Sequence, residues 1–237
     1  MAGTSLTTQA RITREGVTIP ASAKAIVGNA TVVNGSGQTG YLTVYPAGGQ
    51  VPLAANIIYF PGQILSNAFT VGLSSNGQFS IFGEKTIDMI VDVAGYYSSE
   101  AVDANGTGLL FSPLSRPLRI LDTRANQGNC DNVSAAINGN SSLAASARLT
   151  CEGITIPAEA QSVLGVVTVI NLTGQAGFLT LYPDNVAQPL AANMIYFPGQ
   201  VLSNAFLVGL DTNTGQFRIF AERSLHAIVD VSGYYAP

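Results

Sequence analysis

Apolar and polar residues alternate with a two-residue period along several short segments of the chain. In segment 86–97 the apolar side chains that share one face are Ile87, Met89, Val91 and Val93. Segment 224–235 repeats this alternation, whereas Lys24–Asn34 is longer and mostly apolar. Alternation predicts strands with one buried face, and the longer apolar run predicts a strand at the centre of a sandwich.

Turn-forming residues separate these segments at short intervals. Ser36-Gly37, Asn76-Gly77 and Thr214-Gly215 supply glycine where a turn needs a positive φ angle. Each half of the chain therefore offers about seven or eight short strands, which is the pattern of a β-sandwich. No helix is expected, because even the Ala- and Ser-rich segment 133–147 lacks an apolar stripe of helical period. The predicted fold class is all-β, with two tandem β-sandwich domains of similar sequence.

The two halves are copies of one repeat. Residues 53–73 and 190–210 differ at only three of twenty-one positions, with an offset of 137 residues. One extra residue in the turn 211–215 makes the later offset 138, and the copies then end alike, with I-V-D-V-A-G-Y-Y at 90–97 and I-V-D-V-S-G-Y-Y at 228–235. A duplicated block of this kind can encode either a duplicated active site or a duplicated scaffold.

The copies differ in how they begin. The second copy is preceded by residues 98–139, which include S-P-L-S-R-P-L-R-I-L-D-T-R at 112–124, and the first copy has no counterpart of this segment. The polar run in 98–111 is the most linker-like part of the chain. The predicted domains are therefore repeat 1 at 1–104, which lacks its opening segment, and repeat 2 at 105–237, which is complete and contains the R-I-L-D-T-R strand.

Composition excludes several partner classes. Of 237 residues 47% are hydrophobic and 10% charged, and the net charge is −4 without a cluster of Lys or Arg. Nucleic acid and anionic membrane are poor partners for such a chain, because both bind through basic patches. No apolar run reaches the ~18 residues that span a bilayer, so no membrane insertion is expected. The first ten residues have neither the basic start nor the apolar core of a signal peptide.

The two cysteines are predicted to form a disulfide. Cys151 aligns with Arg14 of the first copy, and Cys130 lies in the segment that the first copy lacks, so both members of the pair are absent together. A disulfide indicates an oxidising compartment. Two free thiols, or a metal pair with further ligands, are the alternatives.

Charged residues offer few candidates for catalysis. Arg119, Asp122 and Arg124 are the densest charges in the chain, and we expect the arginines to anchor this strand to the sandwich through ion pairs rather than to hold an acidic ligand. His226 is the only histidine and aligns with Asp88, so a shared Ser-His site is excluded.

Shared carboxylates are the remaining candidates for chemistry. Asp92 and Asp230 occupy equivalent positions, and acids of this kind could hold calcium or cleave a glycosidic bond. They lack a ligand-like spacing, so we expect them to accept hydrogen bonds from a neighbouring loop. No enzyme activity, cofactor or metal is expected.

Aromatic pairs suggest carbohydrate binding as an alternative. Tyr59, Tyr96, Tyr196 and Tyr234 each belong to such a pair and are candidates to face a ligand. Adjacent rings on a strand point to opposite faces, so at most one ring of each pair is available. Trp, a common member of sugar-binding platforms, is absent.

Several motifs taken together resemble a known repeat. They are R-x-L-D-T-R at 119–124, G-[IV]-T-I-P, G-x-L-T-[VL]-Y-P, N-x-x-Y-F-P-G-Q with S-N-A-F, and [IV]-V-D-V-x-G-Y-Y. The set covers almost the whole chain and resembles a repeat of large secreted and cell-surface proteins of bacteria. The resemblance implies an extracellular, β-rich, tandemly repeated module, and it carries over no catalytic residue. The first copy departs from it by lacking R-x-L-D-T-R.

The copies agree in apolar strand residues and in turn residues, and they differ at exposed charges, as at Asp88 and His226. This favours scaffold over active site and predicts a non-enzymatic structural or adhesive module. A sandwich without one strand would expose unpaired backbone groups, so an R-I-L-D-T-R-like strand from a neighbouring repeat or another copy is the expected partner. A carbohydrate-binding module with a polysaccharide partner is the alternative function.

Overall fold

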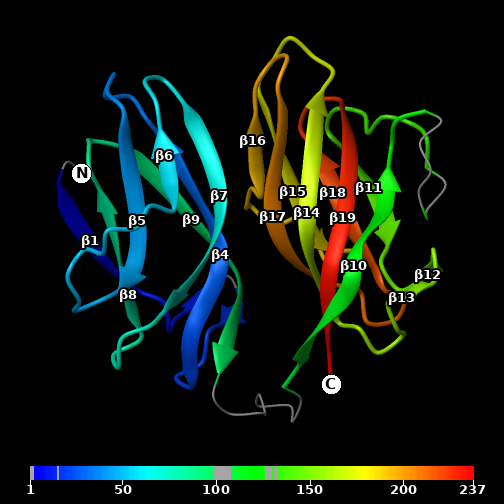
Figure 1. Ribbon diagram of the computed structural model, residues 1–237, viewed down its shortest axis with the longest axis horizontal. Coiled ribbons are helices and arrows are strands. Elements are labelled where there is room, and N and C mark those ends of the chain that lie inside the picture. Colours follow the sequence, from blue (N-terminus) through cyan, green and yellow to red (C-terminus); the bar gives the residue numbers. More distant parts are fainter. Residues whose placement is uncertain (1–2, 15, 99–107, 126–129, 131–132) are drawn as a thin grey trace. The chain divides into compact units, whose positions relative to one another are not determined.

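The chain is described by a computed structural model covering residues 3–14, 16–98, 108–125, 130 and 133–237. The prediction of an all-β fold is confirmed, since every regular element in these residues is a β-strand. They accordingly contain no helix long and apolar enough to cross a membrane. The chain divides into two compact units, residues 1–104 and 105–237, which Figure 1 shows in blue to green and in green to red.

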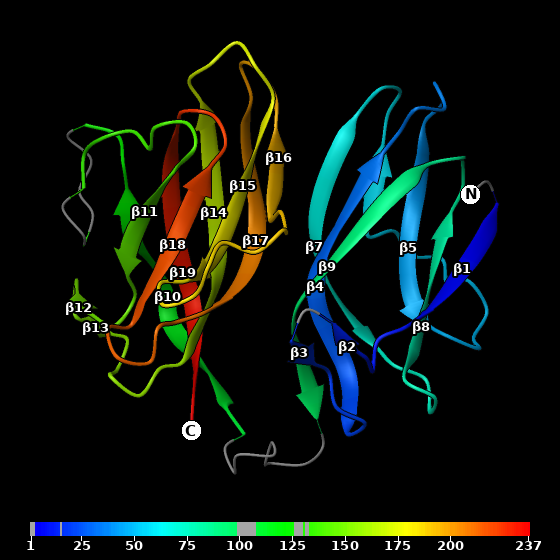
Figure 2. The ribbon, with the colours of Figure 1, turned by 180° about the vertical axis from the view of Figure 1, so that it is seen from behind.

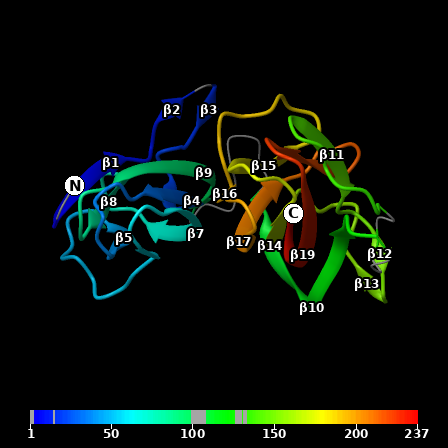
Figure 3. The ribbon, with the colours of Figure 1, turned by 90° about the horizontal axis from the view of Figure 1, so that it is seen from above.

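Unit 1 consists of two antiparallel sheets and a short ribbon. The first sheet has the order β1 (Thr4–Gln9), β8 (Gln78–Gly83), β5 (Gly40–Pro46) and β6 (Ile57–Tyr59). The second has the order β7 (Ile64–Gly72), β4 (Ala23–Val33) and β9 (Asp88–Ser98), and Figure 2 shows β4 between its two neighbours. The ribbon pairs β2 (Thr13–Arg14) with β3 (Val17–Thr18). Figure 3 shows β1, β8 and β5 in one layer and β9, β4 and β7 in the other.

Unit 2 repeats this arrangement and adds one strand. Its first sheet has the order β11 (Ser141–Ser146), β18 (Gln216–Ala221), β15 (Gly177–Pro183) and β16 (Met194–Tyr196). Its second has the order β10 (Leu110–Asp122), β19 (Leu225–Ala236), β14 (Ser162–Asn171) and β17 (Val201–Gly209). The ribbon pairs β12 (Thr150–Cys151) with β13 (Ile154–Thr155). Strands β1 to β9 thus correspond in order to β11 to β19, and β10 is the additional strand.

Alternating side chains fill the space between the two sheets of each unit. The apolar run 24–34, predicted to be a central strand, forms β4, which pairs on both sides. Among the described residues, 26 buried apolar side chains form the core of unit 2 and 13 form that of unit 1. β10 contributes Leu118, Ile120 and Leu121 to the larger core. These three side chains have no counterpart in the described core of unit 1.

Candidate functional site

The edge of strand β9 is where the two units differ most. In unit 2, β19 pairs with β14 on one side and with β10 on the other, so it is a central strand. In unit 1, the equivalent strand β9 pairs with β4, and no other strand among the described residues pairs with it. Figure 1 shows β10 lying beside β19. The second sheet of unit 1 therefore ends at the position where that of unit 2 continues.

Two apolar side chains show what β10 covers. Ile90 is 51% exposed in β9, whereas its counterpart Ile228 is 7% exposed in β19. Val93 is 41% exposed, whereas its counterpart Val231 is 0% exposed. Ile90 and Ile228 are the same residue at equivalent positions, as are Val93 and Val231, so the difference comes from their surroundings. The face and the edge that β10 covers in unit 2 are open in unit 1.

The sequence of β9 is that of a central strand. Asp88–Ser98 contains no Pro, Lys or Arg, which are the residues that commonly protect an exposed sheet edge. Strand β10, which forms the outer edge in unit 2, carries Pro113 and Pro117. Proline has no N–H to offer a further strand and therefore suits an edge. β9 lacks this protection although it lies at an edge.

A β-bulge gives β9 and β19 the same local shape. The pairing register shifts between Val27 and Gly28 in unit 1 and between Leu164 and Gly165 in unit 2. A Cβ atom on Gly28 would lie 2.2 Å from the Asp92 carbonyl oxygen, and one on Gly165 would lie 2.3 Å from that of Asp230. Glycine is therefore required at both positions. The bulge also occurs in both units, so it does not depend on the presence of β10.

Strand β10 attaches to β19 through apolar residues brought together by its own bulge. The register shifts between Arg119 and Leu121, which lie opposite Asp230 and Val229. Simple alternation would bury every second residue, yet Leu118, Ile120 and Leu121 are all 0% exposed. A bulge redirects side chains in this way. Three apolar residues of a four-residue segment thus enter the core.

Arg119 and Asp122 of β10, together with Arg124 just beyond its end, form the expected ion pairs. The Arg119 guanidinium donates two hydrogen bonds to the Asp230 carboxylate, at 2.8 and 3.1 Å. The Arg124 guanidinium donates two more to Asp122, at 2.9 and 2.6 Å, and Arg119 lies 3.7 Å from the same carboxylate. The hydrogen bonds from Arg124 lower the pKa of the Asp122 carboxyl. Asp230 was expected to contact a loop, and its partner is instead an arginine of a neighbouring strand.

Asp122 is fully buried, and its charge is balanced by two arginines close to it in the sequence. Its side chain is 0% exposed, and both arginines that contact it belong to the segment R-I-L-D-T-R. A buried carboxylate is tolerated when it is paired and hydrogen-bonded. The segment therefore brings its own counter-charges, and it can pack against a sheet without leaving a buried charge uncompensated.

Thr123 continues the contact beyond the last residue of β10. Its hydroxyl oxygen accepts the N–H of Ala227 at 2.9 Å and lies 3.0 Å from Nδ1 of His226. With Nδ1 of His226 unprotonated, the hydroxyl can donate its own hydrogen to this nitrogen. In the structure this histidine contacts the residue that follows the added strand.

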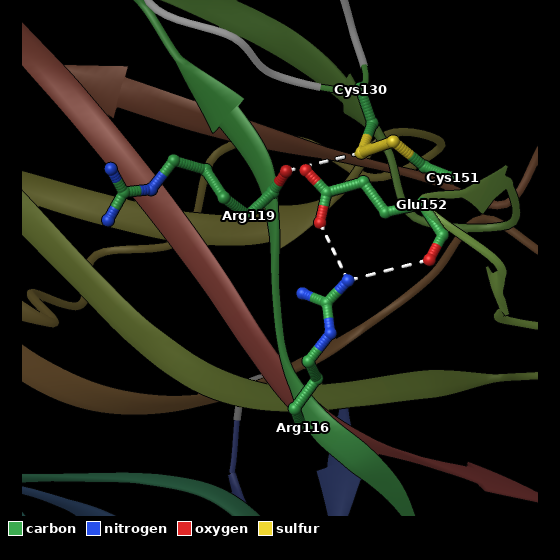
Figure 4. Close-up of a disulfide and its surroundings, with 5 residues drawn as sticks. All are labelled: Arg116, Arg119, Cys130, Cys151 and Glu152. Carbon is green, nitrogen blue, oxygen red and sulfur yellow. Dashed lines mark hydrogen bonds and ion pairs between the residues drawn. A yellow bond between two sulfur atoms is a disulfide. The ribbon is translucent and has the colours of Figure 1, made fainter.

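The predicted disulfide between Cys130 and Cys151 is confirmed. The two Cα atoms lie 5.9 Å apart, and the bond joins the segment after β10 to strand β12. Figure 4 shows that Sγ of Cys130 approaches the Arg119 carbonyl oxygen, at 3.2 Å, and that Arg116 contacts Glu152, at 2.9 Å. A disulfide sulfur has no hydrogen to donate, so the first contact is one of packing. The bond lies next to β10.

The interpretation of Tyr59 and Tyr196 as ligand-facing is wrong, because both are 0% exposed. The hydroxyl of Tyr59 accepts the N–H of Lys85 at 3.1 Å, and that of Tyr196 accepts the N–H of Arg223 at 3.0 Å. Burial raises the pKa of both phenols. These rings are structural.

Tyr96 and Tyr234 are half-buried and pack against the cores of their units. The four tyrosines are therefore not a set of exposed rings. Among the side chains that the structure describes, no three of His, Cys, Asp and Glu gather as metal ligands would.

No family model and no curated protein matches the chain. Among solved structures it is similar to the N-terminal CBM22-1–CBM22-2 tandem domain of Xyn10C from Paenibacillus barcinonensis, with 11% sequence identity and a TM-score of 0.25. The match covers 89% of this chain and 79% of the other. A TM-score this low carries no argument about function. The feature of this chain that bears on function is the open edge of β9.

Proposed function

We propose that the chain is a non-enzymatic structural module of an extracellular assembly, and that a β-strand from outside the described residues completes unit 1 at the edge of β9. The observation that carries this proposal is the exposure of Ile90 and Val93 at positions where unit 2 buries Ile228 and Val231 under β10. Addition of a strand to an open sheet edge is a common mode of protein recognition, in which backbone hydrogen bonds supply affinity and side-chain pockets supply specificity.

The apolar contribution to this binding is modest but real. Full burial of a Val or Ile side chain contributes about 1.5–3 kcal/mol, and roughly half of each side chain remains to be covered at Ile90 and Val93. These two residues would together contribute roughly 2 kcal/mol. Each new backbone hydrogen bond adds about 0.5–1.5 kcal/mol, less the cost of ordering the incoming strand.

An extracellular location is supported by the Cys130–Cys151 disulfide, which persists in oxidising compartments. The resemblance of the repeat motifs to those of bacterial secreted and cell-surface proteins points the same way. The shared carboxylates Asp92 and Asp230 lie on the strand edges that differ between the units, and Asp230 is engaged in an ion pair with Arg119. In unit 2 this shared carboxylate therefore has a structural role, because it holds β10 against β19.

The test is binding of a peptide with the sequence of residues 110–124 to the full chain. The peptide carries a fluorophore, and its anisotropy is followed as the chain is titrated. We expect saturable binding that is lost in Ile90→Glu, because a carboxylate would then face the peptide's own aspartate. The matched control is Ile58→Glu, since Ile58 is 61% exposed on β6 in the other sheet of unit 1.

Three outcomes are informative. Binding that Ile90→Glu abolishes and Ile58→Glu preserves supports the proposal. Absence of binding at millimolar peptide, or equal binding to both variants, contradicts it. Retention of the chain on a polysaccharide column, without peptide binding, would instead support the carbohydrate-binding alternative and overturn the proposal.

A further inference from the structure

We infer that the strand accepted by β9 has the pattern L-R-I-L-D-T-R and binds in a single register. This inference rests on the proposed function and names the partner of the same edge. Unit 2 contains both the acceptor strand and its occupant, and β9 differs little from β19. The contacts of β10 can therefore be transferred position by position to unit 1.

The register follows from the offset of 138 residues between the two acceptor strands. In unit 2, Leu118, Arg119, Leu121 and Asp122 lie opposite Val231, Asp230, Val229 and Ile228. The corresponding residues of unit 1 are Val93, Asp92, Val91 and Ile90. The first leucine of the partner thus covers Val93, its first arginine faces Asp92, and its aspartate lies over Ile90.

Apolar selectivity comes from the bulge in the partner. β10 buries the side chains of Leu118, Ile120 and Leu121 completely. This is possible because the bulge inserts Ile120 as an extra residue between Arg119 and Leu121, which lie opposite consecutive residues of β19. A strand with simple alternation would put one of these side chains into solvent. The acceptor should therefore discriminate against a regular alternating strand of equal hydrophobicity.

Charge selectivity comes from Asp92. It occupies the position of Asp230, which accepts two hydrogen bonds from Arg119. A carboxylate has about four acceptor positions, so it can bind an incoming guanidinium while keeping other contacts. Arginine fits this geometry better than lysine because its planar fork matches both carboxylate oxygens.

The threonine of the pattern also has an acceptor in unit 1. In unit 2 the Thr123 hydroxyl lies 3.0 Å from Nδ1 of His226. Unit 1 has Asp88 at this position, and its carboxylate can accept the same hydroxyl hydrogen. The exchange of histidine for aspartate between the copies therefore preserves an acceptor for the partner's threonine.

The partner belongs to another repeat unit, not to unit 2 of a second copy. The described residues contain two acceptor strands, β9 and β19, and one strand of the L-R-I-L-D-T-R pattern, which is paired with β19. Donation of β10 to a second chain would uncover Ile228 and Val231 while covering Ile90 and Val93. Such an exchange buries no additional apolar surface, and the association of two chains costs translational and rotational entropy.

The experiment compares four labelled peptides on the full chain. They are the 110–124 sequence, the same peptide with its Arg119 position changed to Gln, the same peptide without its Ile120 position, and a peptide of equal length that keeps the arginine and aspartate positions and otherwise alternates Val and Thr. Each is titrated against the original chain and against Asp92→Asn. Light scattering over a concentration series records whether the chain associates with itself.

We expect the Gln peptide and the Asp92→Asn chain each to weaken binding about fivefold, as for a partly exposed bidentate ion pair, and their combination to weaken it no further. The peptide lacking Ile120 and the alternating peptide should bind at least tenfold more weakly than the original. The peptide-side changes do not depend on the folding of the variant chain.

The outcomes separate this inference from the function on which it rests. If the alternating peptide binds as tightly as the original, β9 accepts strands without the proposed selectivity, and only the inference fails. Multiplication of the two fivefold effects would show that the arginine does not contact Asp92, which overturns the register. A chain dimer that the peptide disrupts would overturn the assignment of the source. If no peptide binds, the proposed function fails as well.

Discussion

Paired substitutions at Val93 and Val231 measure how much the added strand contributes to unit 2. The two valines are equivalent in sequence, but Val231 is 0% exposed under β10 and Val93 is 41% exposed. Val→Ala replaces two methyl groups by two hydrogen atoms, a net loss of two methylene equivalents, with about 0.8 kcal/mol lost for each one that is buried and a further cost for the cavity. We expect Val231→Ala to lower the free energy of unfolding by about 2 kcal/mol and Val93→Ala by about 1 kcal/mol.

The assay is hydrogen exchange in increasing urea, read separately for β4 and β14, the central strands of the two units. Leu42→Ala and Leu179→Ala provide the control, because both leucines are 0% exposed in sheets without an added strand. These two should cost the same, about 3 kcal/mol each. Equal costs at Val93 and Val231, with the leucine pair also equal, would refute the claim that β10 makes the difference.

Three further predictions concern unit 2. Gly165→Ala should destabilise it by about 2 kcal/mol in urea unfolding, since the added Cβ would lie 2.3 Å from the Asp230 carbonyl oxygen, and an unchanged midpoint would argue against the bulge. Replacing Cys130 and Cys151 by Ser should cost about 3 kcal/mol by the same assay, whereas a smaller loss than about 1 kcal/mol would indicate that the disulfide hardly restricts the unfolded chain. Because the pKa of Asp122 is lowered in the folded state, its contribution is complete above the unfolded value of about 3.9 and is lost as the pH falls through the folded value. The stability difference from Asp122→Asn should therefore be constant between about pH 5 and 7 and shrink at lower pH, and a difference independent of pH down to about 2 would contradict this.

The sequence predicted the fold class because strand periodicity is a local property. Alternation in 86–97 and the apolar run in 24–34 both appear as strands. The disulfide was predictable because the first copy has no cysteine equivalent to Cys130 or to Cys151, so the two cysteines occur together in the second copy. Both inferences needed only the chain itself.

Other features depend on tertiary contacts and were not predictable. Tyr59 and Tyr196 are buried because Gly40 and Gly177 leave space for their rings, and a Cβ atom on these glycines would lie 2.7 and 2.9 Å from the phenol oxygens. The burial of both Ile120 and neighbouring Leu121 depends on a bulge that alternation cannot reveal.

The open edge of β9 had a weaker signal in the sequence. Strand β9 contains no Pro, Lys or Arg, and neither does β19, which is a central strand. The sequence of β9 alone therefore does not distinguish an edge strand from a central one. The segment 112–124 before the second copy predicted an additional strand in that unit. Only the comparison of Ile90 with Ile228 in the folded units identifies the surface that is exposed without this strand.

The most direct test of the account is amide hydrogen exchange at residues 90–93 of the full chain, measured by NMR with and without the 110–124 peptide. Alternate N–H groups of β9 point toward β4, which already pairs with it. Without peptide, the amides of 90–93 that point away from β4 should exchange faster than their counterparts in 228–231, and saturating peptide should slow them to a similar rate while leaving 228–231 unchanged. Amides at 90–93 that are already as protected as their counterparts, and that do not respond to the peptide, would contradict the claim that β9 is an acceptor edge.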